Sequence, residues 1–460
     1  MRDTRAVDIV KLGNKEAAFL SKTLGKLCPC HTGSGYVYKD LIGQQAFSGS
    51  YGEAGGFYEG EALVSSTDRG AWDRCIDTDG NVVYSVKELL TQRGYRFIHE
   101  EMEEGRRQVS MYPDGEVLTW GPYGWEQDGG LFGYIDEKGE EIIPPIFAKT
   151  WNFDKGRLIA SKGTLVPHES EESTWFVEHE TWGVVDRDGH EVIPFQYNII
   201  VPLFEGMGFA ACIGTEEEGT WFVFDRDGNK LTEKAFPYIW PDENTQSSDL
   251  LLFRTKEYYD CASRVGIFDL KSQTVLMEPK FIELEWIEHG YLLGTWPDED
   301  PEHGDERQQI VYGPDLTPLF QAEADWIHVV GPDVFLLHDY PDCDRLADAQ
   351  GNPIHLPFPI EQLRAEGGEA DIELFFKQNG KWGRLSFALD ITVPAGYDEL
   401  QVLAPGFLLG KKSGTWGVVD VQNHVRIPFL YDKITAETET VWLAEMGNQR
   451  ELYQVRDRQE

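Results

Sequence analysis

The sequence predicts an all-β repeat protein of roughly nine three- to four-stranded units, propeller-like in arrangement and preceded by a short N-terminal helix. One short apolar segment recurs along the chain and is almost unchanged in its best copies. A glycine-containing turn and a second apolar segment with a proline follow the clearest copies. Such a repeat is stronger evidence for the architecture than the secondary-structure propensities of single segments. The copies begin at Phe132, Trp182, Trp221, Val265, Trp382 and Trp416.

Each unit offers short strands joined by tight turns. In the clearest unit, residues 132–136 are apolar and β-prone, and residues 141–144 form a second strand. We expect that second strand to end at its proline, because proline cannot donate to a β-ladder. Phe147 and Trp151 follow as expected aromatic plugs of the core, and residues 157–160 form a third strand.

The recurring motif is Trp-Gly-Val-Val-Asp, as at residues 182–186 and 416–420, followed by a glycine turn and an Ile-Pro or Val-Ile-Pro segment. In this motif the chain resembles the bacterial WG-repeat family. The resemblance covers residues 132–445 well and residues 34–131 loosely. It implies an all-β repeat architecture and a binding role, and it implies no shared chemistry.

Some units depart from the motif, and we expect them to pack less regularly. Phe222 replaces the glycine, Val265 replaces the tryptophan, and Ser386 stands where the aspartate belongs.

The variable spacing of the units argues against the regular coil of a β-solenoid or open β-superhelix, which is the alternative arrangement. The tail at residues 450–455 resembles one more first strand, and we expect it to pair with the edge of another unit.

The N-terminal part of the chain differs from the repeats. Residues 14–24 predict a short amphipathic helix, and residues 85–93 predict a second helix that ends at a glycine. The sequence therefore predicts an N-terminal helical segment over 1–33, divergent repeats over 34–130 and WG-type repeats over 131–460.

The excess of acidic residues is the most unusual feature of the composition. The chain carries 80 acidic and 41 basic residues, a formal net charge of −39. This charge opposes direct binding to nucleic acid or to an anionic membrane, and it favours salt-sensitive association with a basic protein. The sequence shows no apolar run of membrane-spanning length, no signal peptide and no disulfide-framework spacing among its six cysteines. We expect a cytoplasmic protein without a cofactor.

Acidic loops between the repeats are the candidate partner-binding surface. They occupy one place in register, after a third strand and before the next Trp-Gly strand, so we expect them to emerge on one side of the array. Trp296, beside the last loop, is the expected aromatic contact. The alternative is that the loops are solvated linkers. Their acidic residues are Glu169, Glu171, Glu172, Glu216, Glu217, Glu218, Asp298, Glu299, Asp300, Asp305 and Glu306.

Other candidate groups favour structural roles. Cys28 and Cys30 with His31 would need a distant fourth ligand, such as Cys75, to hold zinc, so we assign no metal. The aspartates that end the first strands precede glycine turns, where aspartate caps the turn, so we do not assign them to calcium. Several tryptophans offer stacking platforms, but their positions match core plugs. They are Trp120, Trp125, Trp240, Trp286 and Trp326.

The sequence shows no recognisable catalytic motif. We therefore expect a non-enzymatic protein-binding repeat protein. Its most concrete form is an acidic immunity protein that neutralises a basic bacterial toxin, for instance a nuclease. The alternatives are a carbohydrate-binding, small-ligand-binding or enzymatic propeller, and a general scaffold.

Overall fold

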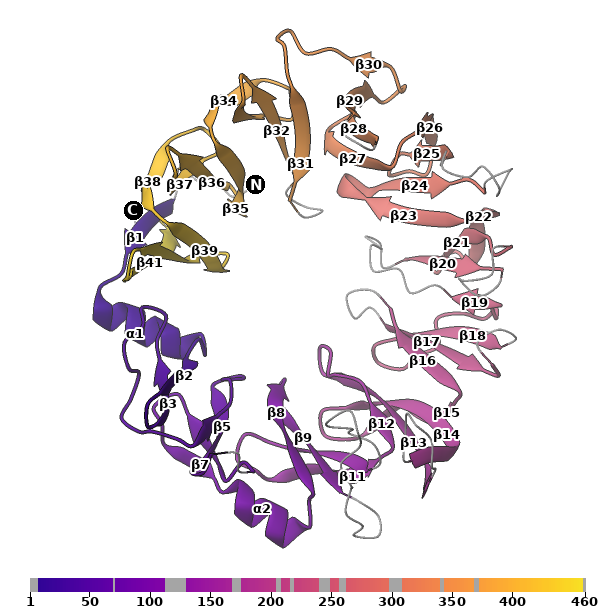
Figure 1. Cartoon of the computed structure of the whole chain (residues 1–460). Helices are drawn as coiled ribbons and strands as arrows, with labels where there is room; N and C mark the ends of the chain where they lie inside the picture. Colours follow the sequence, from indigo (N-terminus) through magenta and orange to yellow (C-terminus); the bar gives the residue numbers. More distant parts are fainter. Residues whose placement is uncertain are drawn as a thin grey trace. The chain divides into compact units, whose positions relative to one another are not determined.

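Two compact units of antiparallel β-sheet make up the chain (Figure 1). One consists of Met1–Lys15, Asn244–Phe268 and Val275–Glu460, and the other of Glu16–Glu243 and Asp269–Thr274. The prediction of an all-β repeat protein with a short N-terminal helix is confirmed. The computed structural model describes residues 7–68, 71–111, 130–167, 175–203, 208–215, 219–239, 249–255, 262–297, 308–339, 343–367 and 372–457.

In the unit centred on Glu16–Glu243, the sheets have the orders β2-β3, β4-β5-β6-β7, β8-β9-β10-β11, β12-β13-β14-β15 and β16-β17-β18. The strands are β2 (Cys28–Thr32), β3 (Gly35–Lys39), β4 (Glu53–Ala54), β5 (Glu61–Ser65), β6 (Arg74–Asp77), β7 (Val82–Tyr84), β8 (Phe97–Glu103), β9 (Arg106–Met111), β10 (Leu131–Ile135), β11 (Glu141–Phe147), β12 (Lys149–Thr150), β13 (Arg157–Pro167), β14 (Trp175–Asp186), β15 (Glu191–Tyr197), β16 (Ile199–Pro202), β17 (Gly208–Ile213), β18 (Thr220–Asp225) and β19 (Tyr238–Ile239).

In the other unit, the strands β20 to β38 form consecutive antiparallel sheets, and the last sheet has the order β1-β41-β40-β39. The strands are β1 (Val7–Lys11), β20 (Leu250–Arg254), β21 (Val265–Asp269), β22 (Thr274–Phe281), β23 (Glu283–Ile287), β24 (Tyr291–Thr295), β25 (Gln308–Tyr312), β26 (Pro318–Glu323), β27 (Trp326–Gly331), β28 (Val334–Asp339), β29 (Cys343–Asp348), β30 (Pro353–Ile354), β31 (Gln362–Glu366), β32 (Glu373–Gln378), β33 (Lys381–Leu385), β34 (Ile391–Tyr397), β35 (Glu399–Ala404), β36 (Phe407–Lys412), β37 (Thr415–Asp420), β38 (Val425–Tyr431), β39 (Lys433–Thr438), β40 (Val441–Met446) and β41 (Gln449–Asp457).

Two helices match the sequence prediction. Helix α1 (Asn14–Thr23) follows β1, and helix α2 (Val86–Arg93) follows β7. The Ser85 hydroxyl accepts a hydrogen bond from the backbone N–H of Glu88 at 3.3 Å, and Gly94 ends the helix with φ 75°. The domain boundaries predicted at 33 and 130 stay a prediction.

The glycine of the Trp-Gly motif lies where two strands approach most closely. A Cβ atom on Gly183 would stand 2.8 Å from the carbonyl oxygen of Ile193, and one on Gly383 would stand 2.5 Å from that of Val393. Opposite each glycine the edge strand bulges by extra residues, which include the motif's proline. Because the edge strand needs no outward donor, proline fits there. The expectation that the strand ends at Pro144 is therefore wrong, since β11 runs on to Phe147.

In the unit that begins at Trp221, the glycine is missing and the edge strand does not form regularly. Phe222 takes the glycine position in β18, and its sheet contains three strands, β16-β17-β18. Only isolated bridges, from Trp221 to Phe236 and from Phe224 to Lys230, mark the described path of the next segment. The Lys230 ammonium stands 3.7 Å from the centroid of the Phe222 ring. The three-stranded sheet and the isolated bridges confirm the irregular packing expected of this unit.

The aspartate at the end of each Trp-Gly strand caps the following turn. Asp186 Oδ1 accepts the backbone N–H groups of Asp188 and His190, both at 2.9 Å. Although burial opposes the effect, these bonds hold the pKa of Asp186 below its ordinary value. Ser386 replaces the aspartate without loss of the cap, because its hydroxyl accepts the N–H groups of Ala388 and Asp390 at 3.2 Å. The expected structural role of these residues is confirmed.

Sheets and sequence repeats are out of phase by two strands. The Trp-Gly strand and the proline strand are the third and fourth strands of a sheet, as β14 and β15 show, and the first two strands come from the preceding repeat. The last sheet therefore lacks a fourth strand of its own, and β1 supplies it (Figure 1). The tail, as β41, pairs with β40 of its own sheet and with β1, rather than with the edge strand of another repeat unit as we expected.

The core lies between neighbouring sheets. Phe147 and Tyr197 are buried as expected, whereas Trp151 is 44% exposed. Phe153, two residues later, is buried in its place and packs edge-on against Tyr134 with ring centroids 5.1 Å apart. The prediction that Trp151 is a core plug is therefore wrong. In the segment that follows the short strand β12, Phe153 is the aromatic residue that enters the core.

We predict that Gly383→Ala lowers the free energy of unfolding by about 1–3 kcal/mol, because the new methyl group would collide with the Val393 carbonyl. Gly396→Ala, in the same sheet, is the matched control. A Cβ there meets only the Pro394 carbonyl oxygen, at 3.7 Å, so we expect a change within about 0.5 kcal/mol. Denaturant unfolding of both variants checks this, and equal effects would contradict the steric account.

We also predict that cysteines introduced by Ile9→Cys and Val455→Cys form a disulfide on mild oxidation. These residues are directly opposed in the β1–β41 pair and pack on the same core. Opposed residues have Cα atoms roughly 4.5–5.5 Å apart, within disulfide range. Val10→Cys with Val455→Cys is the control, since Val10 faces the other side of the strand. Peptide mapping that finds the bond in the control pair alone would refute the register.

Candidate functional site

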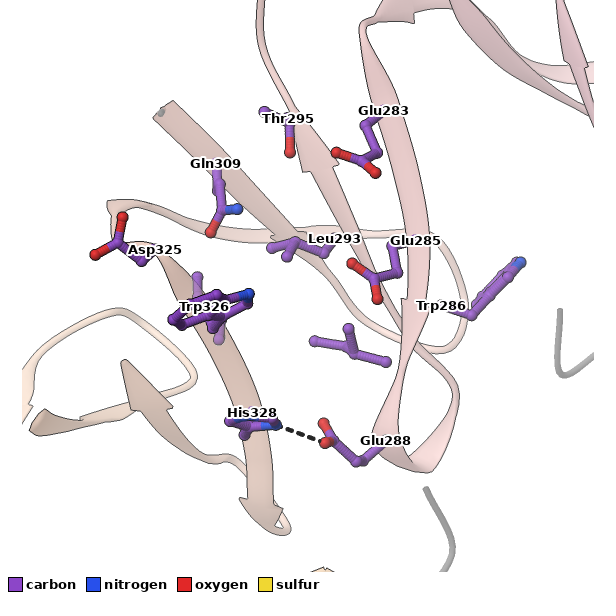
Figure 2. A pocket seen from close by; sticks show the side chains of 12 residues that line it. Glu283, Glu285, Trp286, Glu288, Leu293, Thr295, Gln309, Asp325, Trp326 and His328 are labelled. Carbon is purple, nitrogen blue, oxygen red and sulfur yellow. Dashed lines mark hydrogen bonds and ion pairs between the residues drawn. The ribbon is translucent and has the colours of Figure 1, made fainter. Parts of the chain in front are cut away.

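A pocket of about 260 Å³ lies between β23 and β27, the first strands of two consecutive sheets (Figure 2). The core shared by these sheets closes it from below, through residues such as Ile287, Leu293 and Ile327. The side chains that line it come from β23, β24, β25, β27 and the short turn after β23. They are Glu283, Glu285, Trp286, Ile287, Glu288, Leu293, Thr295, Gln309, Asp325, Trp326, Ile327 and His328.

Strand alternation explains why polar groups gather there. Glu283 and Glu285 are two residues apart and share one face of β23. Trp286 belongs to the opposite face, points away from the pocket in Figure 2 and is buried. On β27, Trp326 and His328 share the pocket face, while Ile327 between them is buried in the core.

An ion pair joins His328 of β27 to Glu288 in the short turn after β23. The His328 Nδ1 donates to Glu288 Oε1 at 2.8 Å, and the backbone N–H of Val329 donates to Glu288 Oε2 at 2.9 Å. The hydrogen bond to Glu288 raises the pKa of His328 above 6.5, against the effect of burial. Burial works against the ionised form of Glu288, yet the bonds from His328 and Val329 hold its pKa below 4.5. Glu283, Glu285 and Asp325 are the other acidic residues that line the pocket.

Trp326 forms an exposed aromatic wall of the pocket. Its side chain is 59% exposed, although the sequence predicted a core position, so that prediction is wrong. The ring stacks on His338 of β28, with centroids 5.4 Å apart and planes 28° apart. Asp344 in turn is hydrogen-bonded to the Nδ1 of His338. One face of the indole is therefore covered and held, and the exposed area of the ring is available to a ligand.

Gln309 supplies an unsatisfied acceptor. It lies on β25, lines the pocket and is 4% exposed. Its Oε1 atom has no hydrogen-bond partner among the described residues. A buried amide oxygen without a donor costs free energy. The pocket therefore combines carboxylates, an amide oxygen and an aromatic face, all of which accept a hydrogen-bond donor or a cation.

The acidic loops predicted as the partner-binding surface lie outside the described residues, so their convergence stays a prediction. This applies to Glu169, Glu171, Glu172, Glu216, Glu217, Glu218, Asp298, Glu299, Asp300, Asp305 and Glu306. Trp120, Trp125 and Trp240 lie outside them as well.

Trp296 is described and is half-buried. Its ring lies 4.5 Å from that of Phe281, and the Lys280 ammonium stands 5.4 Å from its centroid. Its role in partner binding stays a prediction.

Sequence reasoning missed the pocket, although one signal was present: Glu283, Glu285 and Glu288 surround Trp286 in a short run.

The cysteine segment forms a strand. Cys28 and Cys30 lie on one face of β2, and His31 lies on the other, where its ring packs edge-on against Tyr36 at 5.1 Å. Cys75 is buried, with its Sγ 3.2 Å from Glu61 Oε2. These residues therefore do not present four ligands to one point.

One cluster of carboxylate and imidazole groups among the described residues has the spacing of metal ligands. Asp186, Asp188 and His190 place ligand atoms within 4.8 Å of one another. Their contacts are those of the capped turn described above.

Three segments of the chain match the family model of the WG containing repeat, at residues 132–163, 182–212 and 416–439. The predicted resemblance is confirmed at these segments, which are WG repeats. A comparison with curated protein sequences finds no match. No described helix has the length and apolar character needed to cross a membrane.

Several solved structures are similar to this chain. One is the β-propeller domain of the Trilobed protease from Pyrococcus furiosus, with 13% identity over 64% of this chain and 99% of that one, at a TM-score of 0.27. A eukaryotic initiation factor matches with 12% identity over 79% and 90%, at 0.34. BamB from Moraxella catarrhalis matches with 9% identity over 66% and 96%, at 0.24. These scores are too low to support an inference about this chain.

We predict that the His328–Glu288 interaction stabilises the fold most between about pH 4.5 and 6.5. The raised pKa of His328 gives stability that is present at low pH and lost as the pH rises through it. The lowered pKa of Glu288 gives stability that is lost as the pH falls through it. A double-mutant cycle with His328→Ala and Glu288→Ala should show a larger coupling at pH 5.5 than at pH 9. A coupling that does not change with pH would contradict a charged pair.

Proposed function

We propose that this chain is a non-enzymatic repeat protein that binds a basic protein. The observation that carries the proposal is the acidic pocket between β23 and β27, in which Glu283, Glu285 and Asp325 surround an exposed tryptophan. The WG repeats support a protein-interaction module. The net charge of −39 supports a basic partner, because long-range attraction speeds association and excludes acidic competitors.

The most concrete form of the proposal is an immunity protein that neutralises a basic bacterial toxin in the cytoplasm. A toxin that acts on nucleic acid carries a positive surface for phosphates, and an acidic inhibitor can occupy that surface. The acidic loops at 169–172, 216–218 and 298–306 extend the same argument, since together they contain twelve carboxylates, of which eleven (all except Glu302) were assigned to the candidate surface.

We predict that the tagged full-length chain captures one dominant basic protein from its source cells at low salt. Because exposed charges are screened over about 10 Å at 0.1 M salt and over about 3 Å at 1 M, a high-salt wash should release this protein. Mass spectrometry identifies it, and co-expression then tests whether the chain relieves its toxicity. Many weak partners, or capture that salt does not affect, would contradict the proposal.

Neutralised loops provide the matched test. Replacing the eleven assigned loop carboxylates and Glu302 by their amides should weaken binding of the captured protein strongly and flatten its salt dependence. The control neutralises exposed carboxylates in other turns, such as Glu137 and Glu439, which should have a smaller effect. Equal effects would show that only the net charge matters, and the loops would then not form the docking surface.

A further inference from the structure

We infer that the pocket between β23 and β27 binds one neutral sugar ring, a pyranose, whose C–H face lies on Trp326 and whose hydroxyl groups meet the polar side chains beside it. This ligand site goes beyond the proposed function, and its test uses no protein partner. No sequence motif points to the site, because its walls come from strands that are separated along the chain.

Strand pairing places a polar row in one wall of the pocket. Glu283 of β23 is directly opposed to Thr295 of β24, and Thr295 is directly opposed to Gln309 of β25. Directly opposed residues share one face of a sheet, and all three of these residues line the pocket. A carboxylate, a hydroxyl and an amide therefore lie side by side. A sugar hydroxyl can bond with each of them, because it both donates and accepts a hydrogen bond.

The buried amide in this row is the first sign that a ligand belongs in the pocket. Gln309 is 4% exposed, and its Oε1 atom has no hydrogen-bond partner among the described residues. Figure 2 shows the side chain extending toward Trp326. A buried acceptor without a donor costs free energy. A sugar hydroxyl that donates to this oxygen would remove that cost.

The aromatic wall is the second and independent sign. Trp326 is 59% exposed, and the ring of His338 holds it from one side, with centroids 5.4 Å apart. The face of an indole is electron-rich, so it attracts the slightly positive C–H groups on the flat side of a pyranose. Because the indole is already held in place, stacking a sugar on it costs little side-chain entropy.

His328 suits a hydroxyl ligand in both of its protonation states. Its Nδ1 is bonded to Glu288, and its side chain is 41% exposed. The Nε2 atom donates when the ring is charged and accepts when the ring is neutral, and a hydroxyl can answer either. The carboxylates of the lining do not need to lack other partners, because one carboxylate can accept several hydrogen bonds.

The size of the pocket fits one sugar ring. Its volume of about 260 Å³ lies below the roughly 300–1,000 Å³ of sites that enclose a drug-sized ligand. The pocket therefore suits a monosaccharide, or the terminal residue of a longer glycan whose other residues remain in solvent.

Saturation-transfer NMR with the full chain tests the inference. The probes are glucose, galactose, mannose and N-acetylglucosamine, each as the free sugar and as its methyl pyranoside. We expect at least one to bind with a dissociation constant of about 0.1–10 mM, since so small a ligand makes few contacts. Transfer should be strongest to the C–H protons on one face of the ring. A methyl pyranoside that binds as well as its free sugar would identify the end of a glycan as the ligand, and a preference for the free sugar would identify the monosaccharide.

Two further probes represent other classes of ligand. Adenosine offers a planar base to the indole, and methylguanidinium offers a planar cation. The inference is overturned if no sugar shows transfer at about ten times the highest expected constant, or if either of these probes binds more tightly than every sugar.

Substitutions in the pocket locate the binding. Trp326→Ala should weaken the best sugar by about tenfold, and Trp326→Phe should restore part of the loss. Trp151→Ala is the matched control, because Trp151 is also exposed, at 44%, and lies in the other unit. Thermal unfolding checks that the variants are folded. Equal sugar binding by Trp326→Ala and Trp151→Ala would overturn the inference.

Gln309→Met separates a binding role from a structural one. The change keeps the length of the side chain and removes the unpaired oxygen, so we expect no loss of thermal stability. We expect the sugar to bind about fivefold more weakly, because one hydrogen bond is lost. A lower melting temperature with unchanged sugar binding would show that Gln309 serves the fold and not a ligand.

Failure of this inference can be told apart from failure of the proposed function. If one basic protein is captured and no sugar binds, the inference fails and the proposed function stands. If a sugar binds in a Trp326-dependent way and no basic protein is captured, the sugar site stands and the proposed function fails.

Discussion

The repeat depends on one close approach, between the glycine of the Trp-Gly strand and the carbonyl oxygen of the edge strand. A Cβ atom at Gly133, Gly183 or Gly417 would come within 2.5–2.8 Å of that oxygen. With glycine, the edge strand can bulge inward, place its proline outside the ladder and return an aromatic side chain to the core. Where Phe222 stands instead, the edge strand is reduced to isolated bridges. Glycine therefore permits the bulged form of the fourth strand, while sheets such as β23-β24-β25-β26 have a fourth strand although β25 contains no glycine.

The pocket follows from the same sheets. Because side chains alternate along a strand, Glu283 and Glu285 of β23 share the face of Ile287, which is buried in the shared core, whereas Trp326 and His328 of β27 lie on the face opposite the buried Ile327. The two rows carry acidic and aromatic residues, and the His328–Glu288 pair bridges them. The buried pair Arg107 and Glu61 shows the contrasting case, in which opposite charges meet inside the fold, with 3.3 Å between their atoms. In the pocket, the carboxylates of Glu283, Glu285 and Asp325 lie beside the His328–Glu288 pair at the edge of the shared core.

Local rules predicted much of the fold. The turn aspartates, the caps of helix α2 and the plugs Phe147 and Tyr197 follow from residue type and spacing, and the structure has them. Trp151 and Trp326 were assigned to the core and are exposed. Their aromatic character does not fix the face of the strand on which they lie. A shift of one residue turns a side chain from the core to solvent, and only the strand pairing sets that register.

The sequence by itself determined the strand content, the repeat motif, the places where it fails and the acidic charge, because each depends on neighbours along the chain. The tertiary structure decided how strands group into sheets, since the sheet begins two strands before the motif and β1 completes the last one. It also decided the pocket, in which Glu285, Gln309 and Trp326 come from three strands. Their proximity depends on pairing and packing between sheets, and these long-range contacts have no signature in the spacing of residues.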